Sequence, residues 1–146
     1  MNPASRKKGP RLSALCATAV ISLAAYSAFA IGADVKVTLS GDQEVPPVKT
    51  AAQGSGTISV AADKSVSGSV KTTGVAGTMA HIHEAAAGKN GPVAVPLAKS
   101  GDNTWAVPAG AKLNDAQYEA FKAGNLYVNV HSAGNPGGEI RGQIKP

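Results

Sequence analysis

The three histidines of the chain have the residue type and the spacing of a metal-ligand set. His81 and His83 lie two residues apart in the alternating segment Met79–Glu84, which predicts a β-strand with both imidazoles on one face. His131 ends a second alternating segment that begins at Leu126. A His-x-His pair with a third imidazole from a neighbouring strand suits zinc or copper. The alternative is three surface histidines without a ligand, and the motif alone does not choose between them.

The last two predicted strands, Leu126–Val130 and Glu139–Ile144, form a hairpin if residues 132–138 connect them. We expect the register that keeps the apolar side chains of both strands on one face. On the other face, this register places three pairs of polar side chains directly opposite each other. The pairs are His131 with Glu139, Asn129 with Arg141, and Tyr127 with Gln143. One face of the sheet is therefore predicted to be strongly polar.

Four further residues could support the histidines or the surrounding structure. The Glu139 carboxylate could orient His131 by accepting a hydrogen bond from the ring nitrogen that does not bind the metal. Arg141 could attract an anion to the metal, but we favour a structural pair with Glu139 or Asn129. Glu44 could reach a metal, but we favour hydrogen bonds to backbone N–H groups of its loop.

The rest of the chain predicts short strands separated by turns rich in Gly, Pro and Asn. One segment, Ala116–Ala123, predicts a helix capped by Asn114 or Asp115 and ended by Gly124. We expect Trp105 to be buried. The fold class is thus all-β: a Greek-key or immunoglobulin-like β-sandwich or barrel of about eight strands with one short helix. The predicted strands are Val35–Leu39, Gly56–Val60, Val66–Lys71, Met79–Glu84, Val93–Leu97, Thr104–Val107, Leu126–Val130 and Glu139–Ile144.

The first thirty residues have the pattern of a secretory signal peptide. A basic segment ending at Arg11 precedes an apolar run, and Ala28-Phe29-Ala30 has the form that signal peptidase accepts. The apolar run is shorter than the roughly 20 residues of a membrane span. We therefore expect cleavage after residue 30, no membrane anchor afterwards, and a periplasmic or secreted mature domain of residues 31–146. This domain has no cysteine, because Cys16 lies in the signal peptide.

The net charge of +5 also comes mainly from the signal peptide, which holds four of the 14 Lys and Arg residues. The mature domain is close to neutral, so we expect no nucleic-acid partner. Catalysis by serine has no support, since the chain contains no Gly-x-Ser-x-Gly motif.

Five stretches resemble the CHRD (chordin) domain family, in order and over nearly the whole mature chain. They are Gly41–Pro47, His81–His83, Asn90–Val93, Leu126–His131 and Asn135–Gln143. The family occurs in exported bacterial proteins and in the developmental regulator chordin. The resemblance implies a fold and a compartment rather than a reaction.

A more distant likeness is to the β-barrel of copper/zinc superoxide dismutase. His81–Glu84 and the loop Gly134–Gly137 look like parts of that enzyme. Its two-metal site requires more histidines than this chain has, and its disulfide requires cysteines that the mature domain lacks. The likeness therefore implies at most a single mononuclear copper or zinc site, with His81, His83 and His131 as ligands.

Three functions follow, in order of preference. The first is a binding or structural module without catalysis, with an unidentified protein or polysaccharide partner. The second is a mononuclear copper- or zinc-binding protein in metal handling. The third is a redox enzyme of the dismutase type, which requires a redox metal with an open coordination position. Enzymatic activity is therefore the least favoured, and the first two functions are compatible.

Overall fold

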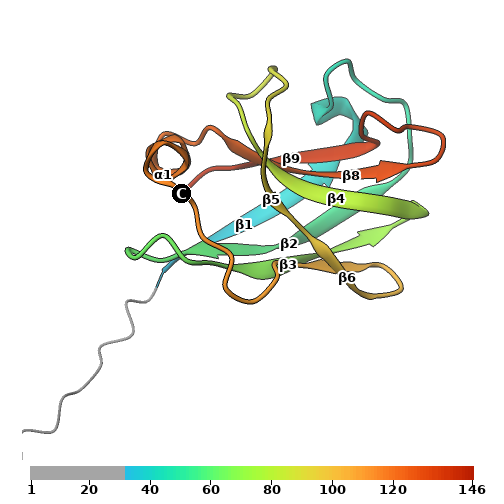
Figure 1. The fold of residues 1–146 in the computed structure, drawn as a ribbon. Coiled ribbons are helices and arrows are strands. Elements are labelled where there is room, and N and C mark those ends of the chain that lie inside the picture. The colour runs from blue at the N-terminus through green and yellow to red at the C-terminus, as the bar shows by residue number, and fades with distance from the viewer. Residues whose placement is uncertain (1–31) are drawn as a thin grey trace, which may run out of the picture.

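A computed structural model describes residues 32–146 of the protein (Figure 1), so the predicted signal peptide lies outside the described residues. The described part contains nine strands, one α-helix and one short 3-10 helix. The helices are η1 (Gly41–Gln43) and α1 (Asp115–Lys122). The strands are β1 (Ala33–Ser40), β2 (Gln53–Val60), β3 (Val66–Thr73), β4 (Gly77–Glu84), β5 (Val93–Pro96), β6 (Ala98–Gly101), β7 (Thr104–Ala106), β8 (Leu126–Ser132) and β9 (Ile140–Ile144).

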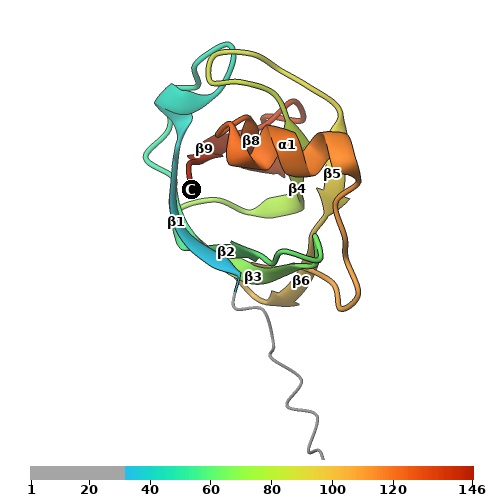
Figure 2. The ribbon, with the colours of Figure 1, turned by 90° about the vertical axis from the view of Figure 1, so that its left-hand side faces the viewer.

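All strands belong to one antiparallel sheet with the order β5-β4-β8-β9-β1-β2-β3-β7-β6. The two strands at the ends of this order, β5 and β6, follow each other in the chain and are separated only by Leu97. The Leu97 N–H donates to the Ala80 carbonyl at 2.9 Å. One continuous segment thus leaves the β4 edge and joins the β7 edge, and the sheet curls into a nearly closed barrel (Figure 2). The all-β prediction is confirmed.

The interior of the barrel is apolar because alternate strand residues point inward. Trp105 is buried, as predicted, and α1 lies across one end of the barrel (Figure 2), where Phe121 is buried. Asn114 and Gln117 form a capping box at the start of this helix. The largest aliphatic side chains that are fully buried are Val37, Leu39, Ile58, Val70, Ile82, Leu126, Val128, Val130, Ile140 and Ile144.

The register predicted for the final hairpin is confirmed along the whole β8–β9 ladder. Leu126 pairs with Ile144, Asn129 with Arg141 and Val130 with Ile140. The sequence patterns missed β6. Its four residues, Ala98–Gly101, are all exposed, so no alternation of apolar and polar residues marks this strand.

The polar outer face of β4, β8 and β9 is covered by three loops, residues 41–52, 85–92 and 133–139, which contact side chains of this face or of its edge. Two of these loops are joined by the Asn90 side chain, which donates to the Val45 carbonyl at 2.8 Å. The cover makes this face a second, polar interior: Asn129 and Arg141 are only 3% and 1% exposed. Between residues 32 and 146, no helix has the length and hydrophobicity needed to cross a lipid bilayer.

Candidate functional site

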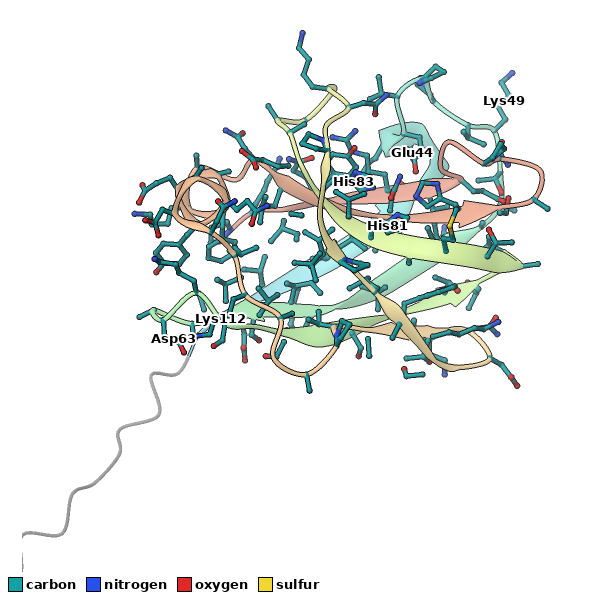
Figure 3. All side chains as sticks on the ribbon, viewed as in Figure 1. Glu44, Lys49, Asp63, His81, His83 and Lys112 are labelled. Atoms are coloured by element: carbon teal, nitrogen blue, oxygen red, sulfur yellow. The ribbon has the colours of Figure 1, made fainter. Side chains whose placement is uncertain are left out.

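The three histidines lie together on the covered face, where the β4–β8 ladder sets their positions. Met79 pairs with His131, His81 with Asn129, and His83 with Tyr127. One nitrogen of each imidazole lies within 4.8 Å of the others, so the group could hold a metal ion. Figure 3 shows His81, His83 and Glu44 in one part of the domain, away from Asp63 and Lys112. His131 is buried and the other two histidines are half-buried, so they are not simple surface histidines.

Backbone carbonyls determine which nitrogen of two imidazoles carries the proton. His83 Nδ1 lies 2.9 Å from the Gly91 carbonyl oxygen, and His131 Nδ1 lies 2.9 Å from the Pro136 carbonyl oxygen. A carbonyl oxygen only accepts hydrogen bonds, so each Nδ1 is the donor and each Nε2 is unprotonated. This is the arrangement in which metal-binding histidines are usually held. The Nε2 atom of His131 accepts a hydrogen bond from His81 Nδ1.

The distances between the imidazoles are compatible with one ion. His81 Nδ1 and His131 Nε2 are 3.0 Å apart. Zinc–nitrogen bonds of 2.0–2.1 Å place tetrahedral ligand atoms roughly 3.3 Å from one another. His83 Nε2 is buried and has no hydrogen-bond partner among the described residues. The three nitrogens lie within 4.8 Å of one another, so an ion would have to draw them closer and displace the proton shared by His81 and His131.

The surroundings keep two of these imidazoles neutral. Burial lowers the pKa of His81, and the neighbouring His131 and His83 lower it further. Burial also lowers the pKa of His83, although the hydrogen bond to Gly91 opposes this effect. Both side chains are thus unprotonated at neutral pH, which is the state that a metal ligand requires.

Tyr127 connects the histidines to a buried arginine. Its ring stacks on His83 with the centroids 4.9 Å apart and the planes only 5° from parallel. The guanidinium carbon of Arg141 lies 3.4 Å from the centroid of the Tyr127 ring. The three side chains form one continuous stack, which fixes the position of the His83 ring.

Arg141 does not make the side-chain pair that the sequence predicted. Its guanidinium donates to the Ala86 carbonyl at 3.2 Å, to Gln143 Oε1 at 3.2 Å and to Asn90 Oδ1 at 3.4 Å. The expected pair with Glu139 or Asn129 is wrong, although Asn129 does lie opposite Arg141 in the ladder. The reason is that the side chain extends beneath the loop of residues 85–92, whose acceptors it satisfies.

Glu139 does not orient His131, contrary to the prediction. The β8–β9 ladder ends at Val130 and Ile140, before this pair. The Glu139 carboxylate accepts hydrogen bonds from Thr50 Oγ1 at 2.8 Å and from Ser132 Oγ. These contacts lower its pKa, with the Ser132 hydrogen bond as the largest cause. Glu139 therefore ties the loop of residues 41–52 to β8, and the Pro136 carbonyl takes the predicted role.

Glu44 lies in the loop of residues 41–52 and is a buried carboxyl group that is only 5% exposed. Burial raises its pKa to about 7, although Arg141, the Val45 N–H and the Asn129 side chain oppose this rise. The Val45 interaction agrees with the expected hydrogen bond to loop backbone. Its Oε1 atom has no hydrogen-bond partner, and a Cβ atom at Gly138 would lie 2.5 Å from it. Glu44 is not in the group of ligand atoms that meet at the histidines.

Sequence reasoning missed the loop atoms that complete this region. The Gly91 and Pro136 carbonyls belong to the backbone, and no residue type marks them. An open cavity of about 420 Å³ lies beside Glu44 and Arg141. No sequence pattern predicts this cavity. The alternation of β4 places Met79 on the face of His81 and His83, and Met79 lies opposite His131 in the β4–β8 ladder.

Comparison with known proteins supports the family resemblance. No curated protein and no solved structure gives a significant match, so the likeness to superoxide dismutase rests on the sequence motifs alone. The CHRD domain model matches residues 35–144, which is more than half of the chain and includes every residue of the histidine group. Membership supports a binding or structural module. The chain belongs to the CHRD domain family.

Proposed function

We propose that this CHRD domain is an exported binding module that holds one copper or zinc ion at His81, His83 and His131. The observation that supports this most strongly is the convergence of the three imidazoles, two of which are held by backbone carbonyls so that Nε2 is unprotonated. Metal-ligating histidines almost always donate their other ring N–H to a carbonyl, a carboxylate or a water molecule in this way.

The energetics of His83 support the same function. Its Nε2 atom is buried without a partner. An unsatisfied buried polar atom costs about 1–3 kcal/mol. A bound metal ion would remove this cost by taking the lone pair. The site is thus a place where binding a ligand stabilises the fold.

Nothing in the geometry favours a dismutase-like reaction over simple metal binding. Arg141 could have attracted an anion only if its guanidinium faced the solvent near the histidines. The side chain is instead 1% exposed and donates to Ala86, Asn90 and Gln143. The proposed function therefore needs no catalytic step.

The test is the metal content of residues 31–146, purified without a His tag. The protein is incubated with Zn²⁺ or Cu²⁺, dialysed and measured by mass spectrometry, beside a His81→Ala/His83→Ala/His131→Ala variant. The control is Asp63→Ala, which removes an exposed carboxylate away from the histidines (Figure 3). Circular dichroism checks that each variant is folded.

We expect about one ion per chain in the wild type and in the control, and loss of binding in the triple variant. Metal at 100 times its Kd should also stabilise the wild type by about 2.7 kcal/mol. The proposal is wrong if the wild type binds no metal, or if the folded triple variant binds as much as the wild type.

A further inference from the structure

Met79 lies on the same face as the histidines. It directly opposes His131 in the β4–β8 ladder and is two residues from His81 on the same strand. Directly opposed side chains have Cβ atoms about 4.5–5.5 Å apart. Methionine has a flexible side chain with a polarisable thioether. Its Sδ atom can therefore reach the place where the nitrogens of His81 and His131 meet.

Packing does not explain this methionine. Its side chain is 49% exposed and does not belong to the hydrophobic core. Among the described residues, Met79 and Val93 are the large apolar side chains left exposed. The other side chains of the two strands on this face are polar or aromatic: His81, His83, Tyr127, Asn129 and His131. A lone exposed thioether beside three imidazoles is thus better explained by chemistry than by burial.

We propose that Met79 supplies a thioether as the fourth ligand and that the site thereby prefers cuprous copper to zinc. This inference rests on the metal site proposed above. Thioether sulfur is a soft ligand that selects Cu(I), whereas zinc sites in proteins use Cys, His and carboxylates. Three imidazoles and one thioether complete a four-coordinate set. Because Met79 is exposed, this ligand lies at the mouth of the site, where an ion enters.

The test compares Cu(I) and Zn²⁺ affinities in a Met79→Leu variant. Leucine keeps the volume and apolar character of methionine and removes only the sulfur. The matched control is Val93→Ala, because Val93 is equally exposed at 49% and opposes His83 across β4 and β5. Cu(I) affinity is measured without oxygen by competition with bicinchoninate, and Zn²⁺ affinity by competition with a chromogenic chelator. X-ray absorption at the copper edge reports directly on a sulfur ligand.

We expect Met79→Leu to weaken Cu(I) binding by about tenfold or more, as loss of a supporting group at a metal site does. Zn²⁺ affinity should stay within about threefold of the wild type, because zinc does not use the thioether. The sulfur signal should be present in the wild type and in Val93→Ala, and absent in Met79→Leu.

The outcomes separate the two proposals. If the wild type binds neither ion, the histidine site itself is refuted, and the role of Met79 with it. If the wild type binds metal but Met79→Leu keeps its Cu(I) affinity and shows the same absorption spectrum, only the role of Met79 is overturned. Equal weakening of Cu(I) and Zn²⁺ binding would also overturn it, since this result indicates a structural effect on the histidines.

Discussion

Replacing Glu44 with glutamine should change how the stability of the domain depends on pH. The buried carboxyl has a pKa of about 7 in the folded protein, compared with an ordinary value of 4.5. Between these values the folded chain retains a proton that the unfolded chain has lost, so stability falls as the pH rises. The contribution is fully present below pH 4.5 and is lost as the pH rises through 7. Glutamine cannot ionise and has nearly the same shape, so the variant should not show this loss.

The magnitude follows from the difference between the two pKa values. Each pKa unit corresponds to about 1.36 kcal/mol. The shift of Glu44 from 4.5 to about 7 therefore costs the wild type about 3 kcal/mol at pH 8 relative to pH 4.5. For a domain of this size, that corresponds to roughly 10 °C in Tm. Glu44→Gln should thus gain stability relative to the wild type as the pH rises, by up to this amount.

Urea denaturation of both proteins between pH 4.5 and 8.5, with a chelator present, measures this difference. His81 and His83 also titrate, and their lowered pKa values destabilise the folded state as the pH falls below their ordinary value. This effect is common to both proteins and cancels in the difference between their free energies of unfolding. The control is Glu119→Gln, at a carboxylate whose side chain is 70% exposed. It should follow the wild type within about 0.5 kcal/mol at every pH.

Parallel curves for the wild type and Glu44→Gln over this pH range would refute the reasoning. Such a result would mean that Glu44 is ionised in the folded domain at ordinary pH. The loops would then have to solvate or pair a charge that the structure leaves without a partner at Oε1.

Two further substitutions test the covered face, both measured by urea denaturation at pH 7. Arg141→Lys should lower the free energy of unfolding by about 2–4 kcal/mol, because an ammonium group cannot replace the planar stack on Tyr127 and the three hydrogen bonds; a change below 0.5 kcal/mol, on the order of a neutral surface substitution, would contradict this. Gly138→Ala should cost about 2 kcal/mol or more, because φ is +130° and the new Cβ would lie 2.5 Å from Glu44 Oε1. Gly134→Ala is its control, since nothing lies within 4 Å, and equal costs at both positions would show that the contact with Glu44 is unimportant.

The strands and their faces could be predicted because alternation of side chains is a local property of the backbone. Val130 and Ile140 share the apolar face, and this alone placed Asn129 opposite Arg141. The same alternation placed His81 and His83 together. The β6 strand could not be predicted, because all its residues are exposed and its sequence therefore lacks the alternation of apolar and polar residues.

The contacts of the polar side chains could not be predicted, because they depend on loops. Alternation showed that Arg141 and His131 point away from the apolar core, but not what covers them. The cover comes from segments 41–52, 85–92 and 133–139, whose paths no periodicity describes. Arg141 consequently binds Ala86 and Asn90, and Glu139 binds Thr50 and Ser132, instead of the partners directly across the strands.

The amino-acid sequence alone is enough to predict an all-β domain of the CHRD family with three histidines on one polar face. Both the two-residue alternation of a strand and the family motifs are local patterns, which can be recognised from the order of residues in the chain. Three features depend on the tertiary structure: this face is covered, the Gly91 and Pro136 carbonyls leave two imidazole Nε2 atoms unprotonated, and Glu44 is a buried carboxyl group with a pKa of about 7. The physical reason is that burial and backbone hydrogen bonds depend on which distant segments meet, and these set the protonation of a side chain.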